Sequence, residues 1–337
     1  MVALFAYLFI ASLGYIIFFI LASFIGPKVA NKLSGKISLY AAMVILPIVV
    51  IMVFSLSMGL AFYFLGEDLI YILPIILIFT IITNLLIYLF SPWIIDLSFF
   101  ARKDDYLQSI VDRVKSRLGY KGKITALVAK GPPNAFAYGN IISGKRVAVT
   151  ESLIKSLDEK ELEAVVGHEI GHHKHKDSVL MILFGLLPTI IYYLGVIIMR
   201  SSIFSRNRKS NGLWLITIFG GLLLVLLSFL VQVLVLAFSR LREYYADLVG
   251  ARATSKIDMQ KALAKIYLYY KSNKDYLLNV KNNPMSTLFI YALANPFISV
   301  SEEDIERIKS LEENNYLEIF QTHPPISKRL RFLDKAI

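Results

Sequence analysis

Two histidines four residues apart, with a glutamate beside the first, carry the strongest chemical signal in this sequence. His168, Glu169 and His172 form an H-E-x-x-H pattern. On a helix, positions i and i+4 lie on one face, so both imidazole rings can bind the same Zn²⁺. Glu169 can then take a proton from a water molecule that the zinc activates. The alternative is a helix that merely exposes two histidines, so a third ligand must be found.

A second pair of spaced residues, Glu243 and Asp247, offers that ligand. These two acids are again at i and i+4 of a predicted helix. A catalytic zinc site needs three protein ligands and one open position, and Glu243 can complete a His₂Glu set with His168 and His172. Asp247 can orient a ligand histidine by accepting its second N–H. We predict one Zn²⁺ per chain in this set, against the alternative of an exposed acidic face paired with neighbouring arginines.

The composition excludes several classes of protein and several kinds of chemistry. Of the 337 residues, 56% are apolar and 18% are charged, and the mean hydropathy is +0.60. Soluble proteins have about 45–50% apolar and about 25% charged residues, so the composition indicates a membrane protein. The net charge of +11 fits basic loops beside a lipid bilayer better than a nucleic-acid partner, and we expect no nucleic acid. Without cysteine there is neither a thiolate ligand nor a cysteine nucleophile.

Five stretches without a charged residue are long enough to cross a bilayer, which takes about 20 apolar residues. They are residues 2–24, 37–66, 69–95, 178–199 and 210–239. They divide the chain into an N-terminal membrane region of three spans (1–98), a polar half with H-E-x-x-H (99–177), a transmembrane hairpin (178–239) and a second polar half with the third ligand (240–337). The even number of crossings between the two motifs keeps all three ligands on one side of the membrane.

The charges of the loops predict an orientation. Loop 27–38 has three lysines and no acid, and turn 67–68 is acidic, so the N-terminus should lie outside and both polar halves in the cytoplasm. The basic loop 200–211 disagrees, unless the hairpin is re-entrant rather than spanning. If the helices of the fourth and fifth stretches continue unbroken to His172 and Glu243, the metal lies at the membrane surface.

The polar halves show short elements of both kinds. Apolar residues at helical spacing over 107–118 predict an amphipathic helix, and residues 124–129 and 146–150 are β-like runs. Between the two runs we expect an edge strand, which begins after Pro132-Pro133 and ends at Gly139-Asn140. Asp158 and Glu161 resemble a capping box, and Asp258 and Ser301 are expected N-caps of later helices.

Together these motifs resemble HtpX-type membrane metallopeptidases, of the gluzincin family that also contains the CAAX prenyl proteases. The resemblance rests on residues 168–172, 243–247, 134–139 and 322–325 with a downstream arginine. It implies a mainly α membrane protein, with a zincin-like α+β metallopeptidase domain that has a small β-sheet and is split by the transmembrane hairpin. Familiar members of this type have four predicted spans, whereas this chain has five apolar stretches.

The resemblance also implies roles for an edge segment of the first polar half. Asn134, Ala135, Phe136 and Ala137 are similar to the Asn-Ala-x-Ala segment of the family, which is thought to bind substrate backbone by strand addition. A plain hairpin strand inside the domain is the alternative for these four residues.

Two residues near the C-terminus belong to the same resemblance. His323 precedes two prolines, as in the family's His-Pro signature, and Arg329 stands six residues later. The resemblance implies that His323 faces the developing oxyanion and that Arg329 braces the acidic site residues, so both join Glu169 as catalytic candidates. Taken alone, His323 is a surface histidine at a helix start. His173 points about 100° away from His172 on a helix, and we interpret it as part of an interfacial polar face.

The sequence therefore predicts a multi-pass cell-membrane zinc endopeptidase with its active site facing the cytoplasm. The resemblance implies hydrolysis of misfolded or membrane proteins, which is quality control under stress. The alternatives are a CAAX-type processing protease and a non-catalytic zinc-binding membrane scaffold. A transporter is disfavoured because no stretch contains a charged residue. Polypeptide substrates and lipid are the expected partners, and the oligomeric state is left open.

Overall fold

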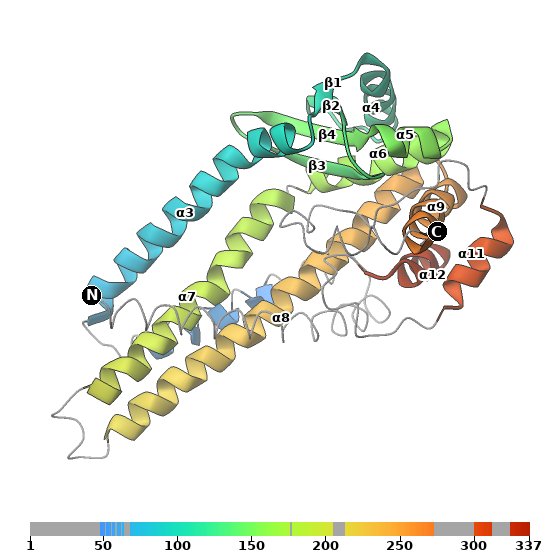
Figure 1. The fold of residues 1–337 in the computed structure, drawn as a ribbon. Helices are drawn as coiled ribbons and strands as arrows, with labels where there is room; N and C mark the ends of the chain where they lie inside the picture. Colours follow the sequence, from blue (N-terminus) through green and yellow to red (C-terminus); the bar gives the residue numbers. More distant parts are fainter. Residues whose placement is uncertain are drawn as a thin grey trace. The chain divides into compact units, whose positions relative to one another are not determined.

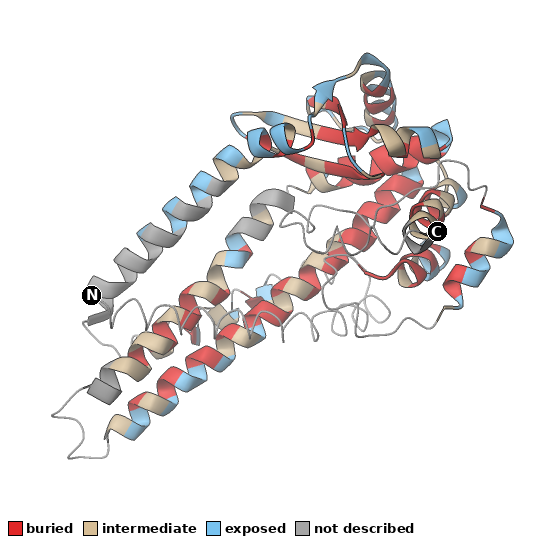
Figure 2. Cartoon of the chain, in the orientation of Figure 1, coloured by how far each residue is buried: buried red, intermediate tan, exposed pale blue. Residues whose placement is uncertain are grey.

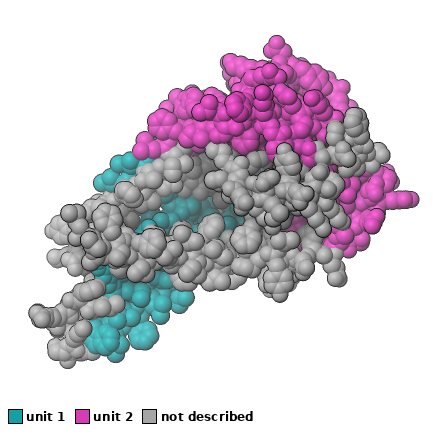
Figure 3. Space-filling model, in the orientation of Figure 1, with its two compact units in different colours: residues 1–85, 179–241 teal, residues 86–178, 242–337 magenta. Residues whose placement is uncertain are grey.

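A computed structural model describes residues 48–50, 52–54, 56–57, 59–61, 63, 68–175, 177–204, 213–272, 300–311 and 324–337. The chain forms two compact units (Figure 3). One unit comprises Met1–Leu85 and Val179–Leu241, and the other comprises Leu86–Ser178 and Arg242–Ile337. The described part is mostly helical with one small mixed sheet (Figure 1).

Long apolar helices dominate the first unit. They are α3 (Asp68–Ser98), α7 (Asp177–Phe204) and α8 (Leu213–Ala253), of which α3 and α8 continue into the second unit. Among the described residues, two helical segments are long and apolar enough to cross a membrane, Leu183–Arg200 and Trp214–Ala253. Stretch 2–24 lies outside the described residues, and most of 37–66 does too, so five spans remain a prediction.

Helices α7 and α8 approach each other closely through glycine. A Cβ added to Gly195 would lie 2.7 Å from the carbonyl oxygen of Gly221, so no larger residue fits there without a shift. The Phe184 and Phe238 rings meet edge to face with centroids 5.4 Å apart. Small residues at a helix–helix contact are typical of membrane helices, which gain little from apolar burial alone.

A four-stranded mixed sheet forms one layer of the second unit. Its order is β1 (Arg102–Lys103), β2 (Ile124–Ala129), β4 (Gly144–Thr150) and β3 (Ala135–Asn140). β2 and β4 are parallel, whereas β1 and β3 are antiparallel to their neighbours. The expected β-like runs and the edge strand are confirmed. The two-residue β1 was missed because it is too short to show a periodicity.

Helices pack against this sheet and against each other. They are α4 (Asp105–Arg117), α5 (Glu151–Ser156), α6 (Glu159–Lys174), α9 (Lys256–Ser272), α11 (Glu302–Lys309) and α12 (Ile326–Ala336). Helix α6 is buried over almost its whole length (Figure 2), and its apolar side chains join the sheet and α4 in one core. This central position makes α6 a rigid support for side chains that project from it.

Of the three helix starts predicted from the sequence, two are confirmed and one is wrong. Glu161 accepts a hydrogen bond from the Asp158 N–H (2.9 Å), which completes the expected capping box of α6, and Ser301 caps α11 as expected. Asp258 is not an N-cap, because α9 begins at Lys256. Its N–H donates to Ser255 Oγ (3.1 Å), so the serine takes the capping position one turn earlier.

The helix that carries H-E-x-x-H does not run into the fourth apolar stretch. Helix α6 ends at Lys174, and α7 begins at Asp177. The N–H of His175 donates to the Gly171 carbonyl (3.3 Å), and its ring stacks edge-on against Tyr245, with centroids 4.0 Å apart. The condition of an unbroken helix is therefore not met between His172 and the fourth apolar stretch. Helix α8, in contrast, is unbroken from Leu213 through Glu243.

Candidate metal centre

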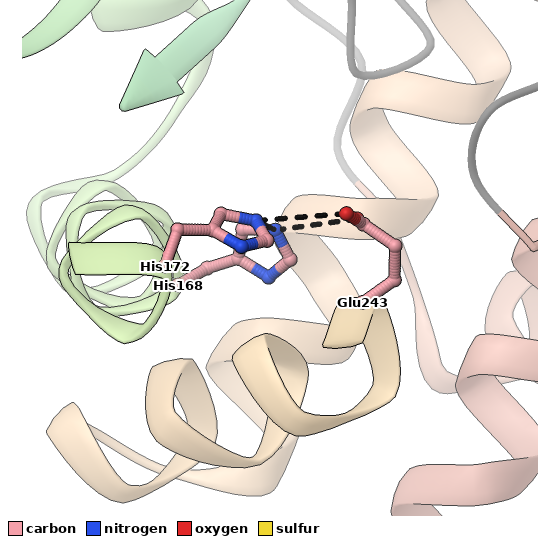
Figure 4. A group of neighbouring side chains, drawn as sticks. All are labelled: His168, His172 and Glu243. Atoms are coloured by element: carbon pink, nitrogen blue, oxygen red, sulfur yellow. Dashed lines mark hydrogen bonds and ion pairs between the residues drawn. The ribbon is translucent and has the colours of Figure 1, made fainter. Parts of the chain in front are cut away.

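Three donor atoms from two helices converge in the second unit (Figure 4). His168 and His172 project from one face of α6, and their Nε2 atoms are 3.3 Å apart. Glu243 of α8 faces them, with its Oε2 3.7 Å from His168 Nε2 and its Oε1 3.7 Å from His172 Nε2. One donor atom from each of the three residues lies within 4.8 Å of the others, and His168 and Glu243 are buried.

A buried ion pair supports the first histidine from behind. Asp247 lies one turn beyond Glu243 on α8, and its Oδ1 is 3.0 Å from His168 Nδ1. Arg329 of α12 donates from Nε and Nη2 to the two oxygens of Asp247, at 2.8 and 2.5 Å. Both partners are fully buried. The contact through Nδ1 leaves Nε2 of His168 directed toward Glu243.

The charge of Arg329 is set by its partner. Burial acts to lower the pKa of this guanidinium, but the carboxylate of Asp247 outweighs burial and raises the pKa above its ordinary value. Arg329 is therefore charged at any physiological pH. A charged and planar donor pair holds the Asp247 carboxylate in one orientation.

Glycines allow α6 and α8 to come close enough for the three donors to meet. A Cβ on Gly171 would lie 3.2 Å from the Ala246 Cα, and a Cβ on Gly167 would lie 2.5 Å from the Ala253 Cβ. A Cβ on Gly250 would lie 2.7 Å from the Ala164 carbonyl oxygen. The sequence analysis missed these residues, although glycines four apart on α6 are a recognisable signal of close helix contact.

Glu169 is a buried acid, and one of its carboxylate oxygens has no hydrogen-bond partner among the described residues. Its side chain is 1% exposed, and Oε1 accepts no hydrogen bond from any residue that the structure describes. A buried polar atom without a partner costs free energy, and such an atom in a native protein is commonly explained by function. Its position next to His168 suits an acceptor for a proton from a catalytic water.

The donor set fits zinc. It offers two imidazole nitrogens and one carboxylate oxygen without sulfur, which is a usual ligand set of catalytic zinc. The Asp247 contact supplies the outer support that a ligand histidine normally has. Glu169 follows His168 directly in α6, and its Oε1 accepts no hydrogen bond from a described residue.

Other predicted site residues lie elsewhere or outside the description. His323 is outside the described residues. Asn134 precedes the edge strand β3, and its N–H and carbonyl are bonded to Thr150. Ala135, Phe136 and Ala137 lie within β3, of which one edge pairs with β4 and the other pairs with no strand in the described part of the chain. A role of these residues in substrate binding stays a prediction.

His173 does not belong to an interfacial polar face. It is 7% exposed, and its Nε2 lies 2.8 Å from the carbonyl oxygen of Arg146 in β4. The interpretation from the sequence is wrong, because α6 packs on the sheet with the side opposite the metal ligands. His173 helps to fix that packing.

Comparison with known proteins decides the family. The model of peptidase family M48 matches residues 101–337, which include every element of this site. The chain belongs to peptidase family M48. It is 48% identical over 330 residues to a protein named "Protease HtpX homolog" from Archaeoglobus fulgidus, covering 97% of this chain and 96% of that one. A protein of the same name from Pyrobaculum aerophilum is 47% identical, covering 96% and 95% of the two chains.

Membership of M48 confirms the resemblance to HtpX-type metallopeptidases and makes the chain a membrane protease. Among the described residues, the two helical segments that are long and apolar enough to cross a membrane fit that location. Among solved structures, the chain is similar to S. mikatae Ste24p, with 20% identity and a TM-score of 0.45, covering 91% of this chain and 66% of that one.

Proposed function

We propose that this M48 peptidase is a zinc-dependent endopeptidase that hydrolyses peptide bonds of misfolded or membrane proteins at the cytoplasmic face of the cell membrane. The observation that carries the proposal is the convergence of His168, His172 and Glu243 beside a buried Glu169 that has no partner among the described residues. Such an arrangement serves hydrolysis and has no evident purpose in a purely structural site.

In this proposal each residue has one role. His168, His172 and Glu243 bind Zn²⁺, which supplies Lewis-acid activation of water and of the scissile carbonyl. Glu169 accepts the proton of the attacking water and delivers it to the leaving amine. Asp247 and Arg329 hold His168 in position, so Arg329 acts through Asp247 and not on the substrate.

The remaining roles come from the family resemblance. His323 stabilises the oxyanion, and the substrate backbone lies along Asn134, Ala135, Phe136 and Ala137. The position of β3 at the edge of the described sheet supports the second role, since a strand edge without a neighbouring strand can bind an extended peptide. Packing of α6 against the same sheet supports it further.

The membrane topology belongs to the same proposal. Five spans cross the membrane, at residues 2–24, 37–66, 69–95, 178–199 and 210–239. The first three form region 1–98 and the last two form region 178–239. The polar regions 99–177 and 240–337 lie in the cytoplasm, and the N-terminus lies outside. Support comes from the lysines of loop 27–38 and from the two described helical segments that are long enough to cross a bilayer.

The decisive test compares wild type with Glu169→Gln, purified in detergent. Zinc content per chain and cleavage of an unfolded model protein are measured for both. We expect about one zinc in each protein and a loss of cleavage of about 100- to 10,000-fold in the variant, because only the proton acceptor is removed. Glu159→Gln is the matched control, since it is the same change at an exposed site on the same helix, and it should cleave like wild type.

Each other outcome has a definite meaning. Equal cleavage by wild type and Glu169→Gln would refute the proposed proton acceptor. Zinc without cleavage of any unfolded protein, in wild type, would favour a processing protease or a non-catalytic scaffold. Absence of zinc from wild type after metal supplementation would refute the metal site.

A further inference from the structure

The turn between β3 and β4, residues 140–144, exposes two large apolar side chains. Ile141 is 87% exposed and Ile142 is 64% exposed. Tight turns normally carry glycine, proline, asparagine, aspartate or serine, and here two adjacent isoleucines stand at the tip. One exposed apolar residue needs no explanation, but a pair at the most prominent point of a hairpin suggests contact with an apolar partner.

Asn140 gives this turn a fixed shape. Its Oδ1 accepts hydrogen bonds from the N–H groups of Ile142 (2.9 Å) and Ser143 (2.8 Å). Its N–H donates to Ser143 Oγ (3.1 Å). The side chain of Asn140 is therefore buried under the turn, and the backbone places both isoleucines on the outer side.

The same side chain ties the turn to helix α3. Asn140 Nδ2 donates to the carbonyl oxygens of Tyr88 (2.9 Å) and Leu89 (2.8 Å). In a regular helix the Tyr88 carbonyl would accept from the N–H of residue 92, which is Pro92 and has none. Asn140 thus donates to a carbonyl that has no helical N–H partner, and the Ser91 hydroxyl donates to the same oxygen (3.1 Å). Internal satisfaction of this kind is what a backbone group needs at membrane depth, where water is absent.

A second set of contacts fixes the position of the β3–β4 hairpin along α3. Tyr138 donates its hydroxyl proton to Asp96 (2.5 Å), and Arg146 forms an ion pair with the same carboxylate. The β3–β4 hairpin therefore runs beside α3 from Asp96 back to Tyr88, which is about 12 Å along a helix axis. The polar pair lies where the apolar run 69–95 has ended, and the turn lies beside that run.

The neighbouring surface of α3 is apolar as well. Phe90, Trp93, Ile94 and Leu97 are all exposed, from 44% to 77%. Tryptophan and other aromatic residues are enriched where membrane proteins meet the lipid headgroups. The two isoleucines continue this surface from the helix onto the hairpin.

We propose that the β3–β4 turn is a membrane anchor whose Ile141 and Ile142 enter the lipid bilayer beside helix α3. The partner is the bilayer itself, because the turn is tied to α3 at the level of an apolar run that has no charged residue. The anchor holds the edge strand β3, which leads into the turn, at the bilayer surface. This contact goes beyond the proposed function and does not depend on catalysis.

The absence of cysteine allows a direct test on the full-length protein. In the Ile142→Cys variant, the single thiol is labelled with an environment-sensitive fluorophore. The labelled protein is then reconstituted in phosphatidylcholine–phosphatidylglycerol vesicles. Lys155→Cys is the matched control, since it is exposed on α5, beyond the opposite end of β4. We expect nitroxide-labelled lipid to quench the label at 142 about threefold or more over the label at 155, as interfacial insertion of several ångströms requires. Aqueous iodide should show the reverse preference.

Two results would overturn the anchor. If iodide quenches both labels equally and nitroxide lipid quenches neither, the turn lies in water. If neither quencher reaches the label at 142, protein covers the turn, from another segment or a second copy of the chain. Ile141→Cys, labelled in the same way, guards against a local effect of one substitution and should repeat the pattern of Ile142→Cys.

Discussion

At the scale of single residues, Asp247 is the side chain that links Arg329 to His168. Its two oxygens accept from Arg329, and one of them also contacts His168 Nδ1. All three side chains are buried, so loss of one member leaves the others without compensation in a medium that solvates charge poorly. The ion pair thus connects α12 to His168, a proposed metal ligand.

Asp247→Asn should weaken zinc binding by roughly 10- to 100-fold, because the shape is kept while the charge that orients His168 is lost. Competition with a chromophoric chelator measures the zinc affinity, and the visible spectrum of the cobalt-substituted protein reports the coordination geometry. Asp334→Asn is the control, since Asp334 lies on the same helix as Arg329 and pairs with Lys309 away from the site. Wild-type zinc affinity and an unchanged cobalt spectrum in Asp247→Asn would remove Asp247 from the site.

At the scale of elements, the crossing of α6 and α8 brings the three proposed ligands together. Gly167 and Gly171 on α6 face Ala246, Gly250 and Ala253 on α8, so the two backbones approach at distances that larger residues would forbid. His168 and His172 lie on the α6 turns that make this contact, and Glu243 lies one turn before it on α8. The ligand geometry is therefore a property of the crossing as well as of the three side chains.

Gly250→Ala should reduce both stability and zinc affinity, because its Cβ would lie 2.7 Å from the Ala164 carbonyl oxygen and 3.3 Å from the His168 Cβ. We expect a roughly tenfold weaker zinc affinity, since metal sites tolerate little displacement of their ligands. Thermal unfolding and chelator competition give the two readouts.

Two other glycines serve as controls for this change. Gly185 of α7 has open space around its Cβ, so Gly185→Ala should be neutral or should stabilise by up to about 1 kcal/mol. Gly195 is crowded but lies in the other unit, so Gly195→Ala should lower stability and leave zinc affinity unchanged. Equal zinc affinities of Gly250→Ala and wild type would show that the crossing does not govern the site.

At the scale of the whole molecule, the metal would join two segments that a long apolar hairpin separates in the chain. His168 and His172 precede α7, whereas Glu243 follows most of α8. A ligand that binds only the folded state stabilises it by RT ln(1 + [L]/Kd), where [L] is the free ligand concentration. Zinc should therefore contribute to the stability of the second unit in addition to its role in catalysis.

Free zinc at about 100 times its dissociation constant should raise the free energy of unfolding by about 2.7 kcal/mol over the chelated protein. Thermal unfolding in detergent with zinc or with a chelator measures this shift. Magnesium should not replace zinc, because it prefers oxygen ligands. Glu243→Gln should abolish most of the shift, and exposed Glu302→Gln should retain it. A zinc shift that survives in Glu243→Gln would point to a different ligand set.

The sequence by itself determined what depends on neighbours along the chain. The i and i+4 spacing of His168 and His172, the capping box at Asp158 and the short β-runs are local patterns, and local hydrogen bonds and side-chain alternation produce them. The family followed from the same short motifs. That is why the type and bounds of most described elements could be predicted.

Tertiary structure alone decided the features that join distant segments. The end of α6 at Lys174, the burial of His173 against β4 and the glycine crossing with α8 each need a partner far away in the sequence. The tie of Asn140 to α3 is of the same kind, since Pro92 shows that a carbonyl lacks its donor but not which residue supplies one. The pairing emerges only when the folded chain brings the two together.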